Sequence, residues 1–189
     1  MAPPDRRVGC GPERDRNRTD TDASARPSST AAPTETLSEA DACDLDRVEA
    51  LLSANDLPTE DVRTGPGQFY LARDRDDERD GGDAVVGVGG VERHGPTGLL
   101  RSVAVEESSR GEGYGTALCA ALEDRARREG VETLYLLTTT AAGFFGRLGY
   151  GAVDRESVPP AIRSTTEFAA LCPASATCMR KRLRGRATE

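Results

Sequence analysis

Residues 110–116, Arg-Gly-Glu-Gly-Tyr-Gly-Thr, combine the residue types that bind a phosphate group. They follow an apolar run and open an amphipathic one, so they lie where a strand turns into a helix. Glycine lets the backbone approach a ligand closely, and the first N–H groups of a helix form an anion site at the positive end of its dipole. Arg110 adds a charged donor. The sequence therefore predicts a phosphate site at this turn.

The glycine spacing distinguishes between three kinds of phosphate loop. A dinucleotide-binding fingerprint requires Gly-x-Gly-x-x-Gly, which the alternation of Gly111, Gly113 and Gly115 does not satisfy. A Walker A loop requires Gly-Lys followed by Ser or Thr, which is missing here. The third pattern, Arg-x-x-Gly-x-Gly starting at Arg110, resembles the pyrophosphate loop of GNAT acetyltransferases. An ordinary glycine-rich turn between a strand and a helix is the alternative interpretation.

Three further phrases carry the same resemblance. Residues 141–150 (AAGFFGRLGY) are similar to the GNAT segment that follows the fifth strand. The phrases LLRSVAV, LYLLTTTA and AIRSTTEFAALCPASATCM together resemble acetyltransferases encoded in arsenic-resistance operons. The resemblance spans about residues 37–183. It implies an α/β GNAT fold, in which flanking helices cover a mixed, mostly antiparallel sheet with a splayed parallel pair of strands at the acyl-CoA cleft.

The resemblance also implies an activity, the transfer of an acetyl group from acetyl-CoA to the amine of a small molecule. An arsenical or phosphinate amino-acid analogue is one candidate acceptor. By the same resemblance, backbone groups of Val103, Ala104 and Val105 would hold the pantetheine arm. The pyrophosphate would be held by Arg110 and the N–H groups of Gly111, Gly113, Tyr114, Gly115 and Thr116. Two other hypotheses stay open: a non-catalytic acetyl-CoA-binding or arsenic-responsive sensor, and a protein N-acetyltransferase.

The catalytic groups of the family are not in their usual places. The amine attacks the thioester directly, so catalysis needs positioning and a proton acceptor. Leu99 stands where some relatives carry a Glu base, and Phe145 stands where many carry a Tyr acid. Glu92 and Tyr150 are the remaining catalytic candidates, although an exposed Glu at a strand end and a core Tyr are the more common explanations.

Polar residues interrupt the two apolar stretches that should splay, 99–105 and 132–138. In a regular strand Arg101 shares a face with Leu99 and Val103, and a buried Arg needs a partner. A substrate carboxylate or a structural Asp or Glu would serve. The candidate substrate contacts are Arg101, Ser102, Thr138 and Thr139, of which the last three are also explained by position and β-propensity.

The cysteines and the single histidine give little support for a metal site. The five cysteines form an odd set without a Cys-x-x-Cys pair, which argues against a disulfide framework or zinc. His94 stands next to Gly95-Pro96 and is expected in a turn. Cys172 and Cys178 are either arsenic ligands or, as free cysteines usually are, small core residues.

Hydrophobic periodicity predicts the elements that position these groups. A first helix should start at Ser38, with Asp41 completing a capping box and an apolar stripe from Leu45 to Leu52. Further helices are expected at 113–129, closed by Gly130, and at 141–148, capped by Thr140. Strands are expected at 67–74, 84–93, 97–105, 131–138 and 176–183, with a weak strand at 151–155. Short helical pieces are expected at Pro159-Pro160 and within 162–171.

Composition sets the domain organisation and the partners. Residues 1–36 contain no Leu, Ile, Phe, Tyr or Trp, so we expect a disordered tail, a GNAT domain at 37–184 and a short basic tail at 185–189. The net charge of −7 argues against nucleic-acid or anionic-membrane partners. Without a long apolar run or a signal peptide, the protein is expected in the cytoplasm. A homodimer stays open.

One compositional feature points to the source. Lys181 is the only lysine among 25 basic residues. An acidic chain with arginine in place of lysine suggests a salt-adapted organism, because surface charge keeps a protein soluble at high salt. A GC-rich genome alone would also favour arginine over lysine.

Overall fold

The computed structural model describes residues 35–74 and 84–183. Most of the predicted N-terminal tail, the charged stretch 75–83 and the basic C-terminal tail lie outside these residues. Within the described ranges, every helix is too short or too polar to cross a membrane.

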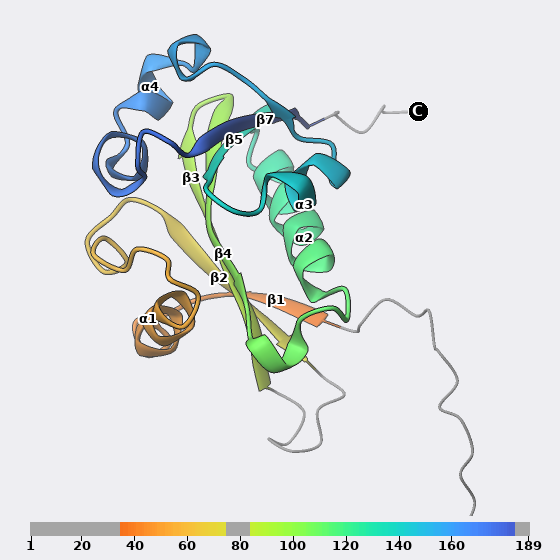
Figure 1. Cartoon of the computed structure of the whole chain (residues 1–189). Coiled ribbons are helices and arrows are strands. Elements are labelled where there is room, and N and C mark those ends of the chain that lie inside the picture. The colour runs from red at the N-terminus through yellow and green to blue at the C-terminus, as the bar shows by residue number, and fades with distance from the viewer. Residues whose placement is uncertain (1–34, 75–83, 184–189) are drawn as a thin grey trace, which may run out of the picture. The chain divides into compact units, whose positions relative to one another are not determined.

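One 7-stranded sheet runs through the described part of the chain, in the order β1-β2-β3-β4-β5-β7-β6 (Figure 1). β4 and β5 are parallel, and the other neighbouring strands are antiparallel. This confirms the predicted α/β fold with a mixed, mostly antiparallel sheet. The strands are β1 (Glu35–Glu39), β2 (Gln68–Asp74), β3 (Ala84–His94), β4 (Thr97–Val105), β5 (Thr133–Thr138), β6 (Gly151–Ala152) and β7 (Thr177–Arg182).

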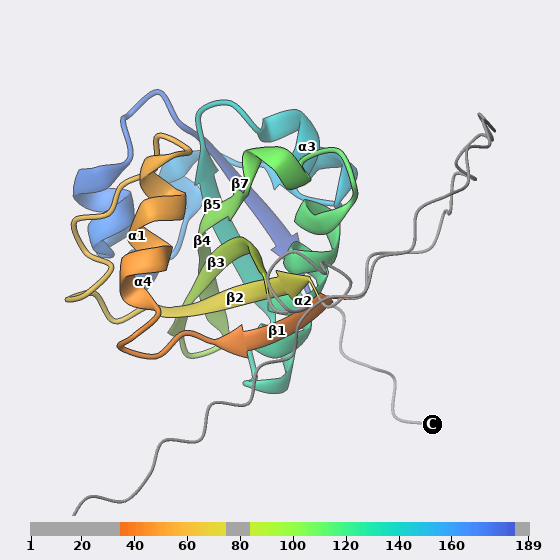
Figure 2. The same cartoon turned by 90° about the horizontal axis from the view of Figure 1, so that it is seen from below.

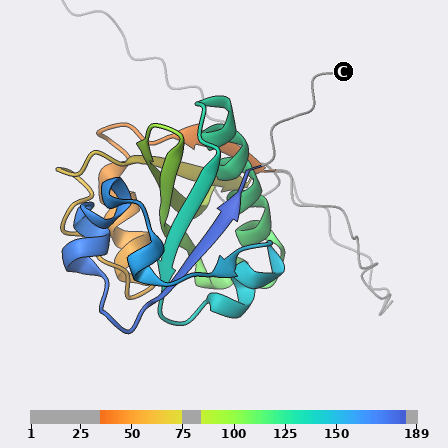
Figure 3. The ribbon, with the colours of Figure 1, turned by 90° about the horizontal axis from the view of Figure 1, so that it is seen from above.

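Helices cover both faces of this sheet. Figure 2 and Figure 3 show α2 and α3 over one face, and α1 and α4 over the other. Three short turns, η2, η3 and η4, connect the main elements. The bounds are α1 (Leu45–Ser53), η2 (Glu107–Ser109), α2 (Tyr114–Arg128), α3 (Ala142–Arg147), η3 (Arg155–Ser157), α4 (Pro160–Arg163) and η4 (Glu167–Leu171).

The two faces have separate apolar cores, because neighbouring residues of a strand point to opposite sides. Leu100 and Leu134 pack with the buried face of α2. Leu99 and Tyr135, one position away, pack with Ile162 of α4. A third cluster lies between α1 and strands β2 to β4. Coverage of both faces explains why the β5 segment is almost continuously apolar.

The N-terminal elements differ from the sequence prediction. Leu37 and Ser38 belong to strand β1, which pairs antiparallel with β2, so Ser38 does not cap a helix. Helix α1 begins instead at Leu45, after a turn in which the Asp41 carboxylate accepts the N–H groups of Cys43 and Asp44. Pairing along the edge of β2 satisfies more backbone groups than one cap does. The strand also includes residues 35 and 36, which the sequence assigned to the tail.

Two later boundaries also change. Ala141, not Thr140, is the N-cap of α3, and its N–H donates to the hydroxyl of Thr138 at 3.0 Å. The predicted strand at 151–155 is reduced to the two residues of β6, and η3 begins at Arg155. The other strands and helix α2 lie where the periodicity predicts them, and Gly130 follows α2 with a positive φ of 86°.

A bulge in β4 changes which residues share a face. Val88 pairs with Ala104 and Gly90 with Arg101, so two residues of β4 oppose the single Gly89. Ser102 takes up the extra length with a φ of 55°. Beyond a bulge the alternation of side chains is shifted by one position. Arg101 therefore shares a face with Leu99, as predicted, but Val103 packs on the α2 face, contrary to the prediction.

Candidate active site

The strands β4 and β5 separate at the centre of the sheet. Their parallel pairing includes Thr97 with Thr133, Gly98 with Leu134 and Leu99 with Tyr135, and it stops there. Both strands nevertheless continue, to Val105 and to Thr138. The backbone edges that face each other beyond Leu99 are thus left without strand partners, and two cavities lie beside this opening.

The first cavity lies at the N-terminus of α2 and has a volume of about 560 Å³. Seven of the predicted cofactor residues line it: Val103, Val105, Arg110, Gly111, Gly113, Gly115 and Thr116. The side chains of the other two do not. Ala104 is buried in the core under α1, and the Tyr114 hydroxyl donates to Asp74 at 2.6 Å. The sequence missed Phe144, Arg147 and Leu148, which enter the lining from α3 and the residue after it.

The glycine loop has the backbone geometry that the sequence predicts. Gly111 and Gly113 have φ values of 84° and 97°, a region that favours glycine. Gly113 is the N-cap of the 15-residue helix α2, and its carbonyl oxygen accepts the N–H groups of Thr116 and Ala117 at 3.0 and 3.1 Å, so the helix dipole begins at this loop. A side chain at Gly115 would lie 3.4 Å from the ring of Phe144. The loop can therefore bring backbone donors and the positive end of a helix dipole close to an anion.

Arg110 connects this loop to the end of α1. Its guanidinium donates to the side-chain oxygen of Asn55 at 2.7 Å and to the backbone oxygen of Val105 at 3.4 Å. Both acceptors are neutral, so the positive charge of Arg110 is not neutralised by these contacts. Arg147 also lines the cavity, and the two cations make it attractive to a phosphate.

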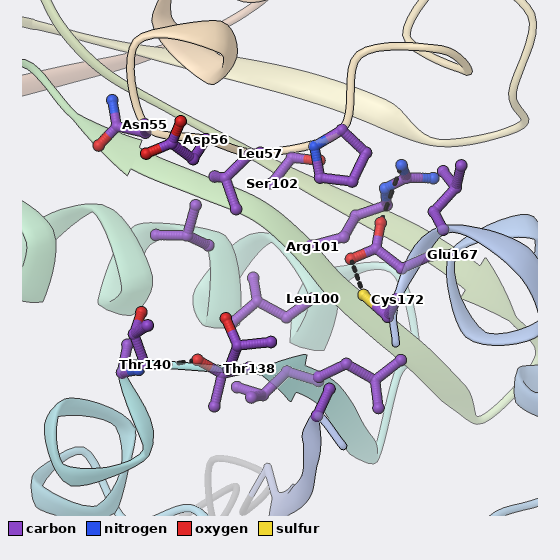
Figure 4. Close-up of a pocket in the computed structure, with 18 of the residues that line it drawn as sticks. Asn55, Asp56, Leu57, Leu100, Arg101, Ser102, Thr138, Thr140, Glu167 and Cys172 are labelled. Carbon is purple, nitrogen blue, oxygen red and sulfur yellow. Dashed lines mark hydrogen bonds and ion pairs between the residues drawn. The ribbon is translucent and has the colours of Figure 1, made fainter. Parts of the chain in front are cut away.

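The second cavity lies on the other side of the opening and has a volume of about 470 Å³. All four predicted substrate residues, Arg101, Ser102, Thr138 and Thr139, line it. Figure 4 labels the first three of them. The loop after α1 and the segment around η4 complete its wall. Three residues line both cavities, namely Val103, Ala141 and Phe145. The cavities therefore meet at the splayed strands.

Arg101 is the centre of a buried charged cluster. Its two terminal nitrogens donate to the two oxygens of Asp61 at 2.6 and 2.7 Å, and its side chain is 1% exposed. Glu167 lies 2.9 Å and Glu92 3.6 Å from the same guanidinium. Burial alone would lower the pKa of Arg101, but the bonds to Asp61 and the charges of both glutamates raise it. The sequence left two kinds of partner open for Arg101, a substrate carboxylate and an Asp or Glu of the protein itself. The structure shows the second kind.

Glu167 is the functional candidate that sequence reasoning missed. It lies on η4, is buried, and faces the second cavity, where its Oε1 accepts the thiol of Cys172 at 3.5 Å. Burial raises the pKa of this carboxyl, and the charge of Arg101 and the Cys172 bond only partly oppose that shift. The available signal was an acidic residue directly before the short apolar segment Phe168 to Leu171.

The two catalytic candidates from the sequence lie outside both cavities. Glu92 is 3% exposed, not an exposed strand-end residue, and contacts the ring of His94 at 2.9 Å. Tyr150 packs edge-on against Phe145 and under the ammonium of Lys181. Burial, with the nearby charge of Glu123, raises the pKa of Tyr150. Tyr150 thus belongs to the α2-side core, and Glu92 to the cluster around Arg101.

The two cysteines considered as arsenic ligands have different surroundings. Cys172 lines the second cavity, and burial together with Glu167 raises its pKa to about 12. Cys178 is buried in β7 among apolar residues. Within residues 35–74 and 84–183, no three His, Cys, Asp or Glu side chains are grouped so that they could hold a metal ion.

Solved structures with this fold include several bound to coenzyme A. The N-acetylglutamate synthase of Neisseria gonorrhoeae, complexed with coenzyme A and L-arginine, superposes with a TM-score of 0.62 at 19% identity, covering 79% of this chain and 33% of that one. A Mycobacterium tuberculosis protein in complex with CoA gives the same TM-score at 22% identity, covering 79% and 99%. At these identities the likeness establishes the fold.

Sequence comparison establishes the family. The model of the acetyltransferase (GNAT) family matches residues 35–150, and the chain belongs to this family. An uncharacterized N-acetyltransferase of Chlorobaculum tepidum is 36% identical over 80 residues, which are 42% of this chain and 48% of the relative. The chain thus spans about half the length of that relative.

Proposed function

We propose that this protein transfers an acetyl group from acetyl-CoA to the amine of a small molecule. The observation that carries the proposal is the junction of two cavities at the splayed strands β4 and β5. One cavity contains the glycine loop at the start of α2, and the other contains polar side chains of both strands. A donor and an acceptor that enter from opposite sides would meet beside Val103, which lines both cavities.

The first cavity suits two parts of coenzyme A, the pyrophosphate and the pantetheine arm. The pyrophosphate would lie against the N–H groups of residues 111–116, next to Arg110 and Arg147. The pantetheine arm carries amides, which need partners of the kind that an unpaired strand edge offers. Backbone groups of residues 103–105 provide that edge, because the pairing of β4 with β5 ends at Leu99. The thioester would then reach the bulge at Ser102.

The resemblance to acetyltransferases of arsenic-resistance operons adds a finer proposal for the acceptor, an arsenical or phosphinate amino-acid analogue. Its ammonium would lie near Glu167. Because Arg101 is already bonded to Asp61, an anionic group of the acceptor would use hydroxyl donors instead. Ser102, Thr138 and Thr139 line the same cavity and offer such donors.

The experiment is an acetylation assay against a panel of amines in high-salt buffer. The panel contains phosphinothricin, arsenical amino acids, ordinary amino acids, their decarboxylated amines and short peptides. Release of coenzyme A is followed by chromatography, because the exposed Cys43 would react with a thiol reagent.

Gly113→Glu tests the glycine loop, since it adds a side chain at positive φ and a negative charge at the phosphate site. Gly151→Glu is the matched control, because a side chain there would meet nothing within 4 Å. We expect turnover in the wild type and the control and none in Gly113→Glu. Binding of coenzyme A without turnover of any amine would support the sensor hypothesis, turnover of peptides alone would support a protein acetyltransferase, and absence of binding would contradict the proposal.

A further inference from the structure

We propose that Glu167 is a catalytic residue that receives the proton of the acceptor amine in the second cavity. This inference rests on the proposed acetyl transfer. It names a proton acceptor for a chain that has Leu99 and Phe145 at the two positions where relatives carry a catalytic Glu or Tyr. The charged side chains that line this cavity are Asp56, Arg101 and Glu167. Of the two carboxylates, Asp56 is exposed to solvent, whereas Glu167 is 6% exposed and lies at the wall formed with β4.

The carboxylate of Glu167 is held in place but has an oxygen without a hydrogen-bond donor. Its Oε1 accepts the thiol of Cys172. Its Oε2 is 2.9 Å from Arg101, yet the two groups are not aligned as a hydrogen bond, and this buried atom has no hydrogen-bond donor. The reason is visible in the cluster, since both terminal nitrogens of Arg101 donate to Asp61. Figure 4 shows the Glu167 carboxylate between Arg101 and Cys172.

The charges around Glu167 come from every element packed against it. Arg101 of β4 attracts its negative form, while Asp61, from the loop after α1, and Glu92 of β3 repel it. Glu92 is itself next to His94, the last residue of β3. One guanidinium thus faces three carboxylates. Burial and this excess of negative charge raise the pKa of Glu167, which makes it a better proton acceptor than an exposed glutamate.

The other titratable groups near the cavity are less suited to this role. The Cys172 thiol has a pKa raised to about 12, so near neutral pH it keeps its proton and serves as a donor to Glu167. Arg155 of η3 donates to backbone oxygens of Phe168 and Pro173 and keeps this segment in position.

The proton transfer completes a balanced reaction. The ammonium of the acceptor loses one proton to a carboxylate oxygen of Glu167, and the amine nitrogen then bonds to the acetyl carbonyl carbon. The carbon–sulfur bond breaks, and its electron pair leaves with the sulfur. A second proton passes from nitrogen to sulfur and gives the thiol of coenzyme A. Glu167 returns its proton to solvent, so each turnover converts an ammonium and a thioester into an amide, a thiol and one proton.

The test compares Glu167→Gln with Glu156→Gln, a matched change at an exposed position of η3. The readouts are kcat/KM from pH 5 to 10 for the panel amine that the wild type acetylates fastest, and the Kd of coenzyme A by calorimetry. We expect Glu167→Gln to lower kcat/KM at pH 7 by about 10²–10⁴-fold. It should leave the Kd of coenzyme A within about 3-fold of the wild-type value, as expected for a group that stabilises only the transition state. Glu156→Gln should match the wild type in both readouts.

The pH profile distinguishes a proton acceptor from a structural residue. The wild-type kcat/KM should fall as pH drops through the raised pKa of Glu167 and level off above it. In Glu167→Gln that plateau should be replaced by a rise of about tenfold per pH unit, because the amine must then lose its proton to solvent. Formate should partly restore the activity of Glu167→Ala.

Three results would overturn the inference. The first is a kcat/KM of Glu167→Gln within about 3-fold of the wild-type value. The second is a pH profile of Glu167→Gln with the same acidic limb as the wild type, and the third is that Glu167→Gln loses coenzyme A binding together with activity. If the wild type acetylates no amine at all, the proposed function fails first. If the wild type acetylates an amine and Glu167→Gln does so equally, only the role of Glu167 fails.

Discussion

At the scale of single residues, Arg101 determines the electrostatics of the second cavity. Its guanidinium contacts Asp61, Glu92 and Glu167, and all four side chains are less than a tenth exposed. Removing one partner of a buried pair leaves an uncompensated charge, which costs more than the pair contributes. The sequence identified Arg101 as a buried charge that needs a partner. It did not identify Asp61 and Glu167 as partners, because they lie 40 and 66 positions away from Arg101 in opposite directions.

Replacing Arg101 with Met should destabilise the protein by about 3–5 kcal/mol at pH 7, because three buried carboxylates lose their cation. Burial already raises the pKa of Glu167, and loss of the Arg101 charge removes the main effect that opposes this shift. A carboxyl with a raised pKa binds its proton more tightly in the folded protein, so the stability of the variant should increase as pH falls through the raised pKa of Glu167. Urea unfolding at pH 5, 6 and 7 measures this.

Arg93→Met is the control, because Arg93 is exposed on β3 and its guanidinium donates to the backbone oxygen of Glu129 at 3.1 Å. A loss below about 1 kcal/mol for Arg101→Met, the range of exposed pairs, would contradict the account. So would a loss that does not depend on pH.

At the scale of elements, the bulge in β4 decides which side chains reach which cavity. Arg101 lies on the α1 and α4 side, whereas Val103 lies on the α2 side, because Ser102 absorbs one extra residue. Periodicity predicts the strand at 97–105 with its observed bounds. It cannot predict this bulge, since a serine in a strand gives no sign of a left-handed conformation, as glycine or asparagine would.

Substitutions at Ser102 should report the left-handed conformation. Ser102→Gly should stay within about 1 kcal/mol of the wild type, because relief of the positive φ offsets the greater freedom of the unfolded chain. Ser102→Val should cost about 2–3 kcal/mol, since a β-branched residue is strained at a φ of 55°. Urea unfolding measures both.

The matched control is Thr133→Val in the regular strand β5, where a β-branched residue suits the backbone. We expect little change there. If Ser102→Val proved as stable as Ser102→Gly, the bulge would not be fixed by the conformation of residue 102.

At the scale of the whole molecule, the chain is acidic and uses arginine almost exclusively as its cation. The sequence predicted the family fold because its signals there are local: a glycine loop between a strand and a helix, and apolar strands of the right length. It could not predict the composition of the second cavity, which brings together the loop after α1, β4, the end of β5 and the segment around η4. The homodimer, the cytoplasmic location and the salt-adapted source stay predictions.

Self-repulsion of the net charge of −7 should make the folded state more stable in salt. Raising KCl from about 0.1 M to 1 M shortens the screening length from about 10 Å to 3 Å. We expect an increase in Tm of about 3 °C or more, which corresponds to roughly 1 kcal/mol for a chain of this size. Scanning calorimetry measures it. A constant or falling Tm would indicate that the arginine-rich composition reflects codon bias alone.

The most direct test of the central claim is a crystal structure of the protein with coenzyme A. The account predicts the pyrophosphate against the backbone N–H groups of residues 111–116, and the pantetheine arm between β4 and β5 with its sulfur beside Val103. Glu167 should then face the sulfur across the second cavity. Coenzyme A bound elsewhere, or a pantetheine arm that does not enter the space between these strands, would contradict the proposal that this opening is the site of acetyl transfer.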